Sequence, residues 1–233
     1  MKIALLGYGK MGKVIERIAL ERGHDIVLKK SSTDSFEGLL HADVAIDFSI
    51  PSSAVLNISE CLNHGIPIVS GTTGWLEDYD KMTALCQAKN GAFIYGSNFS
   101  LGVNLFFELN DYLAKMMAKF NQYTVTMEEI HHTQKLDAPS GTAISLAKGI
   151  IEHSNYESWT LENPKANQIH IDAQRIENVP GTHSIFYNSN VDTIEIKHTA
   201  HNRDGFALGS VIAAEWLVGR KGVFTMRDVL NLK

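Results

Sequence analysis

The most constraining feature of the sequence is a glycine pattern near the start of the chain. Gly7, Gly9 and Gly12 form G-x-G-x-x-G directly after an apolar run at residues 2–6. Apolar side chains then recur at positions 11, 14, 15, 18 and 19, which predicts an amphipathic helix ending near Gly23. Glycines at a strand-to-helix turn let the backbone approach a pyrophosphate, and the helix start supplies free N–H groups. We therefore expect a dinucleotide site; the alternative is a structural turn without a ligand.

Short apolar runs and helical stripes alternate as far as about residue 97. Further strands are predicted near residues 25–28, 43–48, 67–70 and 92–95, and helices near 51–62 and 75–89. Such short runs are typical of strands buried on both faces of a parallel sheet. The first part of the chain is therefore predicted to be an α/β, Rossmann-type domain with about five strands.

The pattern changes after residue 100. A helix is expected over 101–119, and apolar residues alternate with polar ones at 123–128, 169–173 and 193–197, with one more strand at 185–187. Residues 155–167 are the most loop-like stretch, and 206–218 predict an apolar helix. The second part is therefore expected to be α+β, with an open mixed or antiparallel sheet.

Composition narrows the classes of partner. The chain has 233 residues and a formal net charge of −5, which makes it a poor candidate for binding a nucleic-acid backbone. Cys61 and Cys86 lie on predicted helix faces, so we expect buried thiols rather than a disulfide. No apolar run approaches the ~18 residues of a membrane span, and the first run is too short for a signal peptide. We expect a reduced, cytoplasmic protein with no membrane partner.

The end of the second strand bears on the choice of cofactor. Lys29, Lys30, Ser31 and Ser32 stand where an acidic residue would bond the ribose 2′-hydroxyl of NADH, and no carboxylate follows until Asp34. Two ammonium groups and two hydroxyls suit a 2′-phosphate. This favours NADPH over NADH; the alternative is a solvated basic loop.

Two more loops follow predicted strands. They are small, polar turns at residues 71–75 and 96–100, at carboxyl ends of strands, where ligands of such sheets bind. The alternative is that they are turns without a ligand.

The densest polar stretch covers residues 128–143. A predicted strand delivers His131 and His132, Lys135 follows in a loop, and Ser140–Thr142 opens a helix. N–H groups and hydroxyls at a helix start suit a carboxylate, while histidine and lysine can transfer protons. Together they suit a small dianionic substrate that is reduced and protonated.

Two other readings of this stretch exist. Adjacent histidines can bind a metal, but no third ligand follows at a zinc spacing, so we expect no metal site. Alternatively, Ser140 is only a helix cap and His131 only a surface residue.

Several motifs together resemble one family. They are G-x-G-x-x-G at 7–12, Asp47-Phe48-Ser49, Gly71-Thr72-Thr73-Gly74, Ser97-Asn98-Phe99-Ser100, Gly102-Val103-Asn104, the segment from Glu129 to Ala143, and Gly181-Thr182-His183. Over nearly the whole chain the sequence resembles the 4-hydroxy-tetrahydrodipicolinate reductases of diaminopimelate and lysine biosynthesis.

The resemblance implies an oxidoreductase that passes hydride from NADPH or NADH to the cyclic imine substrate with loss of water. His131 matches a proton donor or acceptor and Lys135 a proton donor, while His132, Ser140, Gly141 and Thr142 match groups that hold the substrate carboxylates. The expected cofactor contacts, besides Lys29, Lys30 and Ser31, are Gly7, Tyr8, Gly9, Lys10, Met11, Gly12, Phe48, Gly71, Thr72, Thr73, Gly96, Ser97, Asn98 and Phe99.

It also implies a dinucleotide-binding domain at 1–97 and 207–233, a substrate-binding and oligomerisation domain at 98–206, and a homotetramer. The sequence departs from the family pattern in its short glycine loop and in lacking the acidic residue after the second strand. Two other functions fit parts of the pattern: an NAD(P)-sensing protein without turnover, and a different two-domain Rossmann dehydrogenase. A hydrolase is disfavoured because no nucleophile elbow is present.

Overall fold

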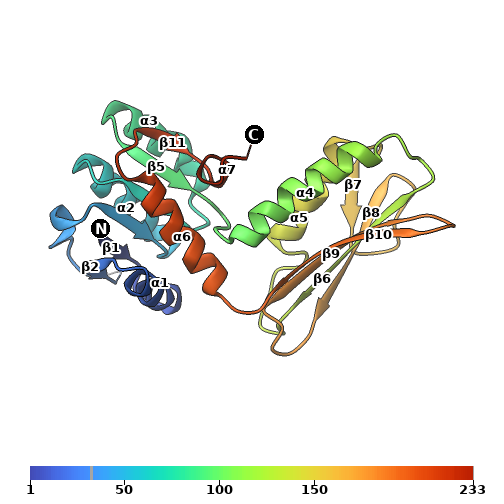
Figure 1. Cartoon of the computed structure of the whole chain (residues 1–233), viewed down its shortest axis with the longest axis horizontal. Coiled ribbons are helices and arrows are strands. Elements are labelled where there is room, and N and C mark those ends of the chain that lie inside the picture. Colours follow the sequence, from blue (N-terminus) through green and yellow to red (C-terminus); the bar gives the residue numbers. More distant parts are fainter. Residues whose placement is uncertain (32–33, 233) are drawn as a thin grey trace. The chain divides into compact units, whose positions relative to one another are not determined.

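The computed structural model describes residues 1–31 and 34–232. The chain divides into two compact units, Met1–Asn104 with Arg203–Lys233 (unit 1) and Leu105–Asn202 (unit 2) (Figure 1). The first crossing between them falls inside helix α4 (Leu101–Met117), and the second falls just before helix α6 (Asp204–Leu217). The boundaries expected from the sequence, after residues 97 and 206, do not coincide with these crossings, and the roles expected of the two domains stay a prediction.

Unit 1 is built on a six-stranded parallel sheet. Its order is β11-β5-β4-β3-β1-β2, and every pairing is parallel. The strands are β1 (Lys2–Leu6), β2 (Asp25–Lys30), β3 (Val44–Asp47), β4 (Ile68–Ser70), β5 (Ala92–Tyr95) and β11 (Gly222–Phe224). Because β1 leads to β2 on one side and β3 pairs with its other side, the strand order reverses at β1, where ligands of open α/β sheets bind.

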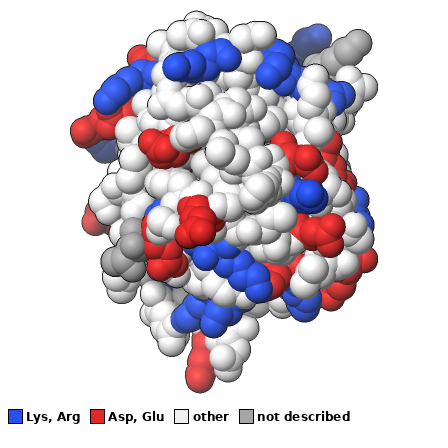
Figure 2. Space-filling model, turned by 90° about the vertical axis from the view of Figure 1, so that its left-hand side faces the viewer, with Lys and Arg blue, Asp and Glu red and all other residues white. Residues whose placement is uncertain are grey.

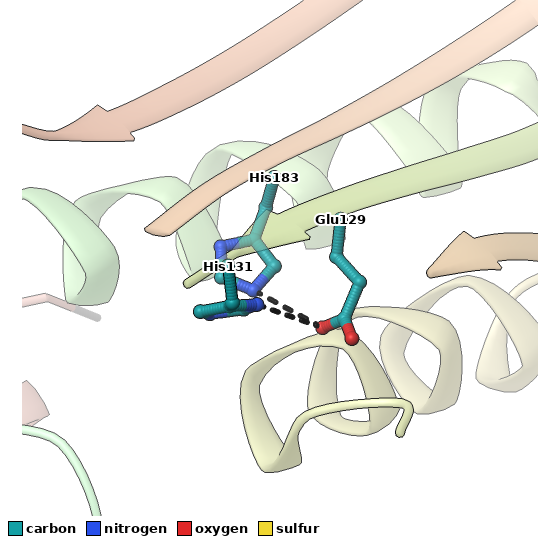
Figure 3. A group of neighbouring side chains, drawn as sticks. All are labelled: Glu129, His131 and His183. Carbon is teal, nitrogen blue, oxygen red and sulfur yellow. Dashed lines mark ion pairs between the residues drawn. The ribbon is translucent and has the colours of Figure 1, made fainter. Parts of the chain in front are cut away.

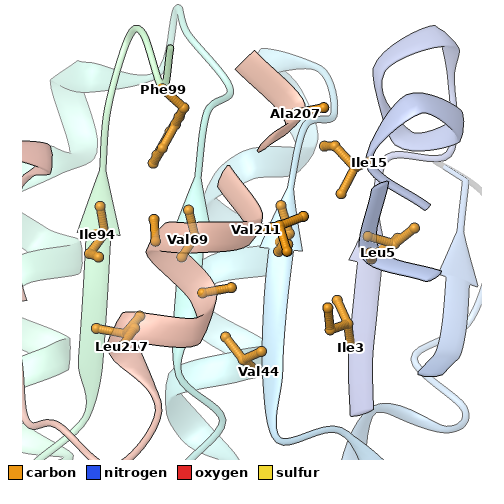
Figure 4. Close-up of a cluster of buried hydrophobic side chains, with 14 of the residues drawn as sticks. Ile3, Leu5, Ile15, Val44, Val69, Ile94, Phe99, Ala207, Val211 and Leu217 are labelled. Carbon is orange, nitrogen blue, oxygen red and sulfur yellow. The ribbon is translucent and has the colours of Figure 1, made fainter. Parts of the chain in front are cut away.

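Helices cover both faces of this sheet. Helices α1 (Lys10–Glu21) and α6 pack on one face, where α6 crosses several strands (Figure 4), and α2 (Pro51–Asn63) and α3 (Tyr79–Ala88) pack on the other. Strand β1 contributes alternate side chains to the two cores, and all four from Ile3 to Leu6 are at most 1% exposed. The prediction of a strand buried on both faces is confirmed. Cys61 and Cys86 are buried free thiols, also as expected.

Unit 2 has an α+β architecture with two layers, one of helices and one of strands. Helices α4 and α5 (Gly141–Glu152) cover one face of a sheet with the order β10-β9-β6-β8-β7 (Figure 1). Its strands are β6 (Thr124–His131), β7 (Ser158–Thr160), β8 (Gln168–Arg175), β9 (Gly181–Asn188) and β10 (Thr193–Ala200). Strand β9 runs antiparallel to β6 and β10, whereas β8 runs parallel to β6 and β7. The expectation of a mixed sheet is therefore confirmed.

Two short strands were not predicted. Strand β7 lies inside the stretch expected to be a loop, and β11 adds a sixth strand to the first sheet from the far end of the chain. Each has three half-buried residues, unlike the equally short but fully buried β4, so neither is visible in the sequence as an apolar run. Short helical segments, namely η1 (Leu39–His41), η2 (Leu76–Asp78) and α7 (Met226–Val229), complete the described elements.

The surface carries charges of both signs. On the face drawn in Figure 2, lysine and arginine side chains lie in separate groups, with aspartate and glutamate side chains between them. Among the described residues, no helix is long and apolar enough to cross a membrane.

Candidate active site

The loop after β1 is tight and can be built only with glycine at two positions. Gly7 has φ of +99°, a conformation that side chains other than glycine rarely adopt, and a Cβ there would overlap the backbone of Phe48. A Cβ on Gly12 would overlap the carbonyl oxygen of Gly7. The Gly7 N–H donates to the carbonyl of Lys30 at 2.8 Å, which ties the loop to the end of β2.

The start of helix α1 is open. Gly9 is its N-cap, no side chain in the described part of the chain caps it, and space remains beside Gly9 where a Cβ would project. The first N–H groups of the helix therefore keep their capacity to bind an anion. This arrangement fits the pyrophosphate of a dinucleotide, as the glycine pattern predicts.

The basic end of β2 has a more specific structure than its sequence indicates. Lys29 pairs with Glu16 of α1, which also accepts a hydrogen bond from the Tyr8 hydroxyl. Lys30 is only 4% exposed, and its ammonium lies 4.7 Å from the centre of the Phe36 ring. Glu16 thus neutralises the charge of Lys29, whereas no carboxylate in the described residues pairs with Lys30.

Ser31 and Ser32 complete the basic loop expected to hold a 2′-phosphate. The Ser31 N–H donates to Asp34 at 2.7 Å, while Ser32 lies outside the described residues. A carboxylate is therefore near the strand end after all, supplied from three residues further along the chain.

A buried carboxylate organises the loops after β3 and β4. Asp47 is fully buried and accepts hydrogen bonds from Ser70, Thr72 and Asn57 at 2.8–2.9 Å. Burial raises the pKa of Asp47 despite these hydrogen bonds. The Thr72 hydroxyl also accepts from the Ser49 N–H, so it joins the two loops and is not free for a ligand.

Two of the predicted cofactor glycines, Gly71 and Gly96, lie against the aromatic rings of Phe48 and Phe99. A Cβ on Gly71 would overlap the Phe48 ring, and the centre of that ring lies 5.8 Å from that of Phe99. Phe99 is buried in the core, and a Cβ on Gly96 would lie only 3.1 Å from atoms of its ring. The other expected contacts lie at the surface or are half-buried: Lys10, Met11, Thr73, Ser97 and Asn98. Their contact with a cofactor stays a prediction.

In unit 2, three strands bring charged side chains onto the face that α4 and α5 cover. Glu129 and His131 continue the inward alternation of β6, Arg175 that of β8 and His183 that of β9. Of these four residues, only His131 is expected from the sequence to be a site residue. The signal was present, because a charged side chain at an inward position of an alternating strand needs a partner inside the protein.

Glu129 is the centre of the resulting cluster (Figure 3). Its carboxylate, with no exposed surface, accepts from the Ser140 N–H at 2.9 and 3.1 Å and from the Arg175 guanidinium at 3.1 Å. Nδ1 of His131 and Nε2 of His183 lie 3.6 and 3.7 Å from the same carboxylate oxygen. Burial acts to raise the pKa of Glu129, but the partners together outweigh it and lower the pKa to about 2.

His131 is held in a neutral form. It is 8% exposed, and its ring packs against the His183 ring with centres 5.0 Å apart. Burial, followed by the neighbouring His183 and then the positive charges of Lys135 and Arg175, lowers the pKa of His131 to about 4, although Glu129 acts in the opposite direction. Its Nδ1 has no hydrogen-bond partner among the described residues.

Helix α5 begins on this cluster. Ser140 is the N-cap, and its Oγ accepts from the Ala143 N–H at 3.2 Å and shares a hydrogen bond of 3.1 Å with Nε2 of His183. Space remains beside Gly141, where no described atom lies within 4 Å of a Cβ position. Together with the half-buried Thr142, this makes a helix start that can accept a carboxylate from the substrate.

The loop between β6 and α5 carries the remaining predicted residues. Lys135 donates to both carboxylate oxygens of Asp137 at 2.8 Å, and Arg175 donates to the carbonyls of Lys135 and Asp137 at 3.3 and 2.6 Å. His132 follows the last residue of β6 and is half-buried, with an Nδ1 that has no partner among the described residues. Arg175 therefore ties the loop to the buried cluster.

The cluster also bears on the metal question. Glu129, His131 and His183 each place a potential ligand atom within 4.8 Å of the others, whereas His132, the neighbour considered with His131 as a metal ligand from the sequence, is not part of this group. The Glu129 carboxylate, however, already accepts hydrogen bonds from Arg175 and Ser140. A cation at this point would compete with the guanidinium for the same carboxylate.

Comparison with known proteins agrees with both units. Residues 1–99 match the family described as dihydrodipicolinate reductase, N-terminus, and residues 102–230 match dihydrodipicolinate reductase, C-terminus. A 4-hydroxy-tetrahydrodipicolinate reductase of Christiangramia forsetii is 55% identical over 99% of this chain and 98% of its own. One of Methanosarcina barkeri is 34% identical over 97% of this chain and 83% of its own.

A solved structure shows the same fold. A dipicolinate-bound dihydrodipicolinate reductase from Paenisporosarcina sp. TG-14 superposes with a TM-score of 0.76 at 22% identity, and the match covers 100% of this chain and 99% of that one. The two-domain plan, with a Rossmann-type parallel sheet and a mixed sheet, is therefore that of these enzymes. The chain belongs to the dihydrodipicolinate reductase family.

Proposed function

We propose that the protein catalyses the NAD(P)H-dependent reduction of 4-hydroxy-tetrahydrodipicolinate to tetrahydrodipicolinate in diaminopimelate and lysine biosynthesis. The observation that carries this proposal is the helix start at Ser140, which stands on a buried charged cluster beside His131 and is preceded by Lys135 in the same loop. The 55% identical relative bears the name of this activity. The reaction takes one hydride and one proton into the substrate and releases one water.

The cofactor supplies the hydride when bound, and the residues of unit 2 supply binding and protons. The free N–H groups at Gly141 and Thr142 bind one substrate carboxylate, since a helix start favours negative charge. His132 contributes a second polar contact. Because Glu129 fixes the Ser140 N–H, the first turn of α5 is already in place before substrate arrives.

Proton transfer depends on the charge of the substrate. His131 alone is neutral at pH 7, since burial holds its pKa near 4. A dianionic substrate beside the ring raises that pKa, because an opposite charge favours the imidazolium. His131 then takes a proton from solvent as substrate binds and keeps it beside the bound anion, while Lys135 leaves Asp137 and donates the one proton that the substrate takes up.

For the cofactor we propose a preference for NADPH. Lys30 supports it, because this ammonium has no carboxylate partner among the described residues. The Lys30→Glu variant is expected to shift the ratio of kcat/KM values toward NADH, whereas Lys89→Glu, the same charge change at the end of α3, leaves the ratio unchanged. An unchanged ratio in Lys30→Glu contradicts the preference.

We further propose a cytoplasmic homotetramer formed through unit 2. Strand β10 is at the edge of its sheet and keeps many of its side chains exposed, which suits a sheet-to-sheet interface. Light scattering after size exclusion should give the mass of four chains. The mass of a single chain is the result that contradicts this assembly.

The activity itself is tested by absorbance. When the purified protein is mixed with NADPH and the freshly made aldolase product, the absorbance of the reduced nicotinamide should fall as NADPH is oxidised. The same mixture without protein is the control. Binding of NADPH without consumption would favour the NAD(P)-sensing alternative. Consumption with other carbonyl or imine substrates, but not with this one, would favour a different dehydrogenase.

A further inference from the structure

A carboxylate of unit 1 lies at the strand end where the sequence has no acidic residue. Strand β2 ends in Lys29 and Lys30, whereas dinucleotide-binding sheets commonly place there a carboxylate that bonds the ribose hydroxyls. Helix α1 supplies one instead, because the Glu16 side chain forms an ion pair with the Lys29 ammonium. A negative charge therefore stands beside the end of β2, although it comes from another element.

The same carboxylate is bound to the glycine loop. Glu16 accepts a hydrogen bond from the Tyr8 hydroxyl, and the Lys29 ammonium lies 5.3 Å from the centre of the Tyr8 ring. The N–H groups of Gly7 and Tyr8 donate to the carbonyl of Lys30 at 2.8 and 3.2 Å. Glu16 therefore contacts both the loop expected to bind the pyrophosphate and the strand end expected to bind the adenosine ribose.

Glu16 keeps its negative charge at neutral pH. Hydrogen bonds with Lys29 and then with Tyr8 lower the pKa of Glu16, and the Glu16 carboxylate in turn raises the pKa of Lys29. The side chain of Glu16 is 17% exposed and that of Lys29 is 44% exposed, so both can meet a ligand at the surface. A partly solvated pair of this kind has a modest influence, so we expect changes in affinity of several-fold.

The other charges at this strand end are arranged differently. Lys30 is 4% exposed and donates to the carbonyl of Ser31 at 3.1 Å. Asp34, the second carboxylate near the end of β2, accepts from the backbone N–H of Ser31. Among the described residues, Glu16 is thus the carboxylate that forms an ion pair with one of the two lysines, and this pair includes Lys29 and not Lys30.

We propose that Glu16 is a specificity-determining residue that limits the discrimination between NADPH and NADH. Its charge offsets that of Lys29 and opposes the 2′-phosphate of NADPH, which carries up to about two negative charges. The same carboxylate accepts a hydrogen bond from the free 2′-hydroxyl of NADH. Lys30 favours NADPH, whereas Glu16 acts in the opposite direction and keeps NADH usable. The inference rests on the dinucleotide site of the proposed function, and its test measures binding without turnover.

The test is a fluorescence titration of the full chain with NADPH and with NADH, which gives the ratio of the two Kd values. Glu16→Gln removes the charge but keeps a side-chain oxygen that can accept from Tyr8. It should strengthen the binding of NADPH relative to NADH about three- to tenfold, as for the gain of one hydrogen bond to Lys29. Lys29→Met leaves the Glu16 carboxylate without this ammonium and should shift the ratio toward NADH.

A double variant separates the effect of charge from a structural disturbance. Glu16→Gln combined with Lys29→Met removes both charges and should return the ratio to within about twofold of wild type, because the two opposite shifts cancel. Glu21→Gln makes the same change at the exposed last residue of α1 and should leave the ratio unchanged.

The outcomes distinguish this inference from the proposed function. If the wild-type protein binds neither nicotinamide, the dinucleotide site is wrong and the inference falls with it. If both bind and Glu16→Gln leaves their ratio unchanged, only the role of Glu16 is overturned. A double variant that differs from wild type as much as Glu16→Gln does would also overturn it, because Lys29 would then have no part in the discrimination.

Discussion

The two helix starts expected to bind ligands are built in opposite ways. Helix α1 begins at a glycine without a side-chain cap, on a loop whose shape is set by close backbone packing at Gly7 and Gly12. Helix α5 begins at Ser140, whose side chain caps the helix and whose N–H is held by a buried carboxylate. The first start is made of backbone alone, and the second is made of backbone supported by charged side chains.

This difference follows from what each start is expected to hold. A long, flexible dinucleotide gains most from close approach to bare backbone, which only glycine allows. A small substrate that must meet proton-transferring groups needs an anion site fixed relative to those groups. Glu129 provides that, because it joins the Ser140 N–H to His131 and His183 in one cluster.

The largest effect should come from the proton-transferring residues of unit 2. His131→Gln and Lys135→Ala are each expected to lower kcat about a hundredfold or more, as for the loss of a general acid or base. Cofactor affinity should stay within about twofold, because both residues belong to unit 2, whereas the hydrogen bonds of the glycine loop are made within unit 1. Steady-state kinetics and a fluorescence titration with NADPH measure the two quantities.

Lys148→Ala is the matched control for Lys135→Ala, since Lys148 is exposed on α5 beyond its first turn. It should keep the wild-type rate. Full activity in either of the first two variants would show that the assigned role is wrong.

The second prediction compares the two starts directly. Gly9 and Gly141 both have free space beside them, so alanine at either position is compatible with the fold. If each glycine faces its ligand, Gly9→Ala weakens NADPH binding and Gly141→Ala raises the KM of the substrate, each by about tenfold through lost close hydrogen bonds. Gly9→Ala should leave the KM of the substrate unchanged, and Gly141→Ala should leave the affinity for NADPH unchanged. Equal loss of both affinities in either variant would mean that the two starts are not separate sites.

The third prediction concerns the support of α5. Ser140→Ala removes the cap and the hydrogen bond to His183, and we expect a loss of about 1 kcal/mol in local stability. Hydrogen exchange should show weaker protection in the first turns of α5. Ser145→Ala, on the exposed face of the same helix, is the control. Unchanged protection in Ser140→Ala would contradict the role of the cap.

The smallest effect is on the titration of His131. NMR of the histidine side chains should give a midpoint near pH 4 for His131, and Lys135→Met should raise it, because the ammonium is one of the charges that lower this pKa. The unfolded chain takes up the same proton near pH 6.5. His131 therefore contributes fully to stability above pH 6.5, and the contribution is lost as the pH falls toward 4. A midpoint between 6 and 7 in the folded protein would contradict the neutral form.

Much of the fold could be predicted because its signals are local. The run at residues 2–6, the helical stripe from Met11 and the alternation at 123–128 each report which faces of one element are buried. Glycine spacing similarly predicted the tight loop after β1, and the Ser140–Thr142 segment indicated the start of α5. Strands β7 and β11 could not be found in this way, because their side chains are only half-buried, whereas the equally short β4 is fully buried and forms an apolar run.

By itself, the sequence determined the two architectures, the glycine loop, and the strand and following loop that carry His131 and Lys135. Only the tertiary structure decided which charges meet: Glu129, Arg175 and His183 come from three strands that are distant in sequence, and Glu16 reaches Lys29 from a neighbouring helix. The physical reason is that periodicity records whether a side chain points inward, whereas its partner depends on strand order and register.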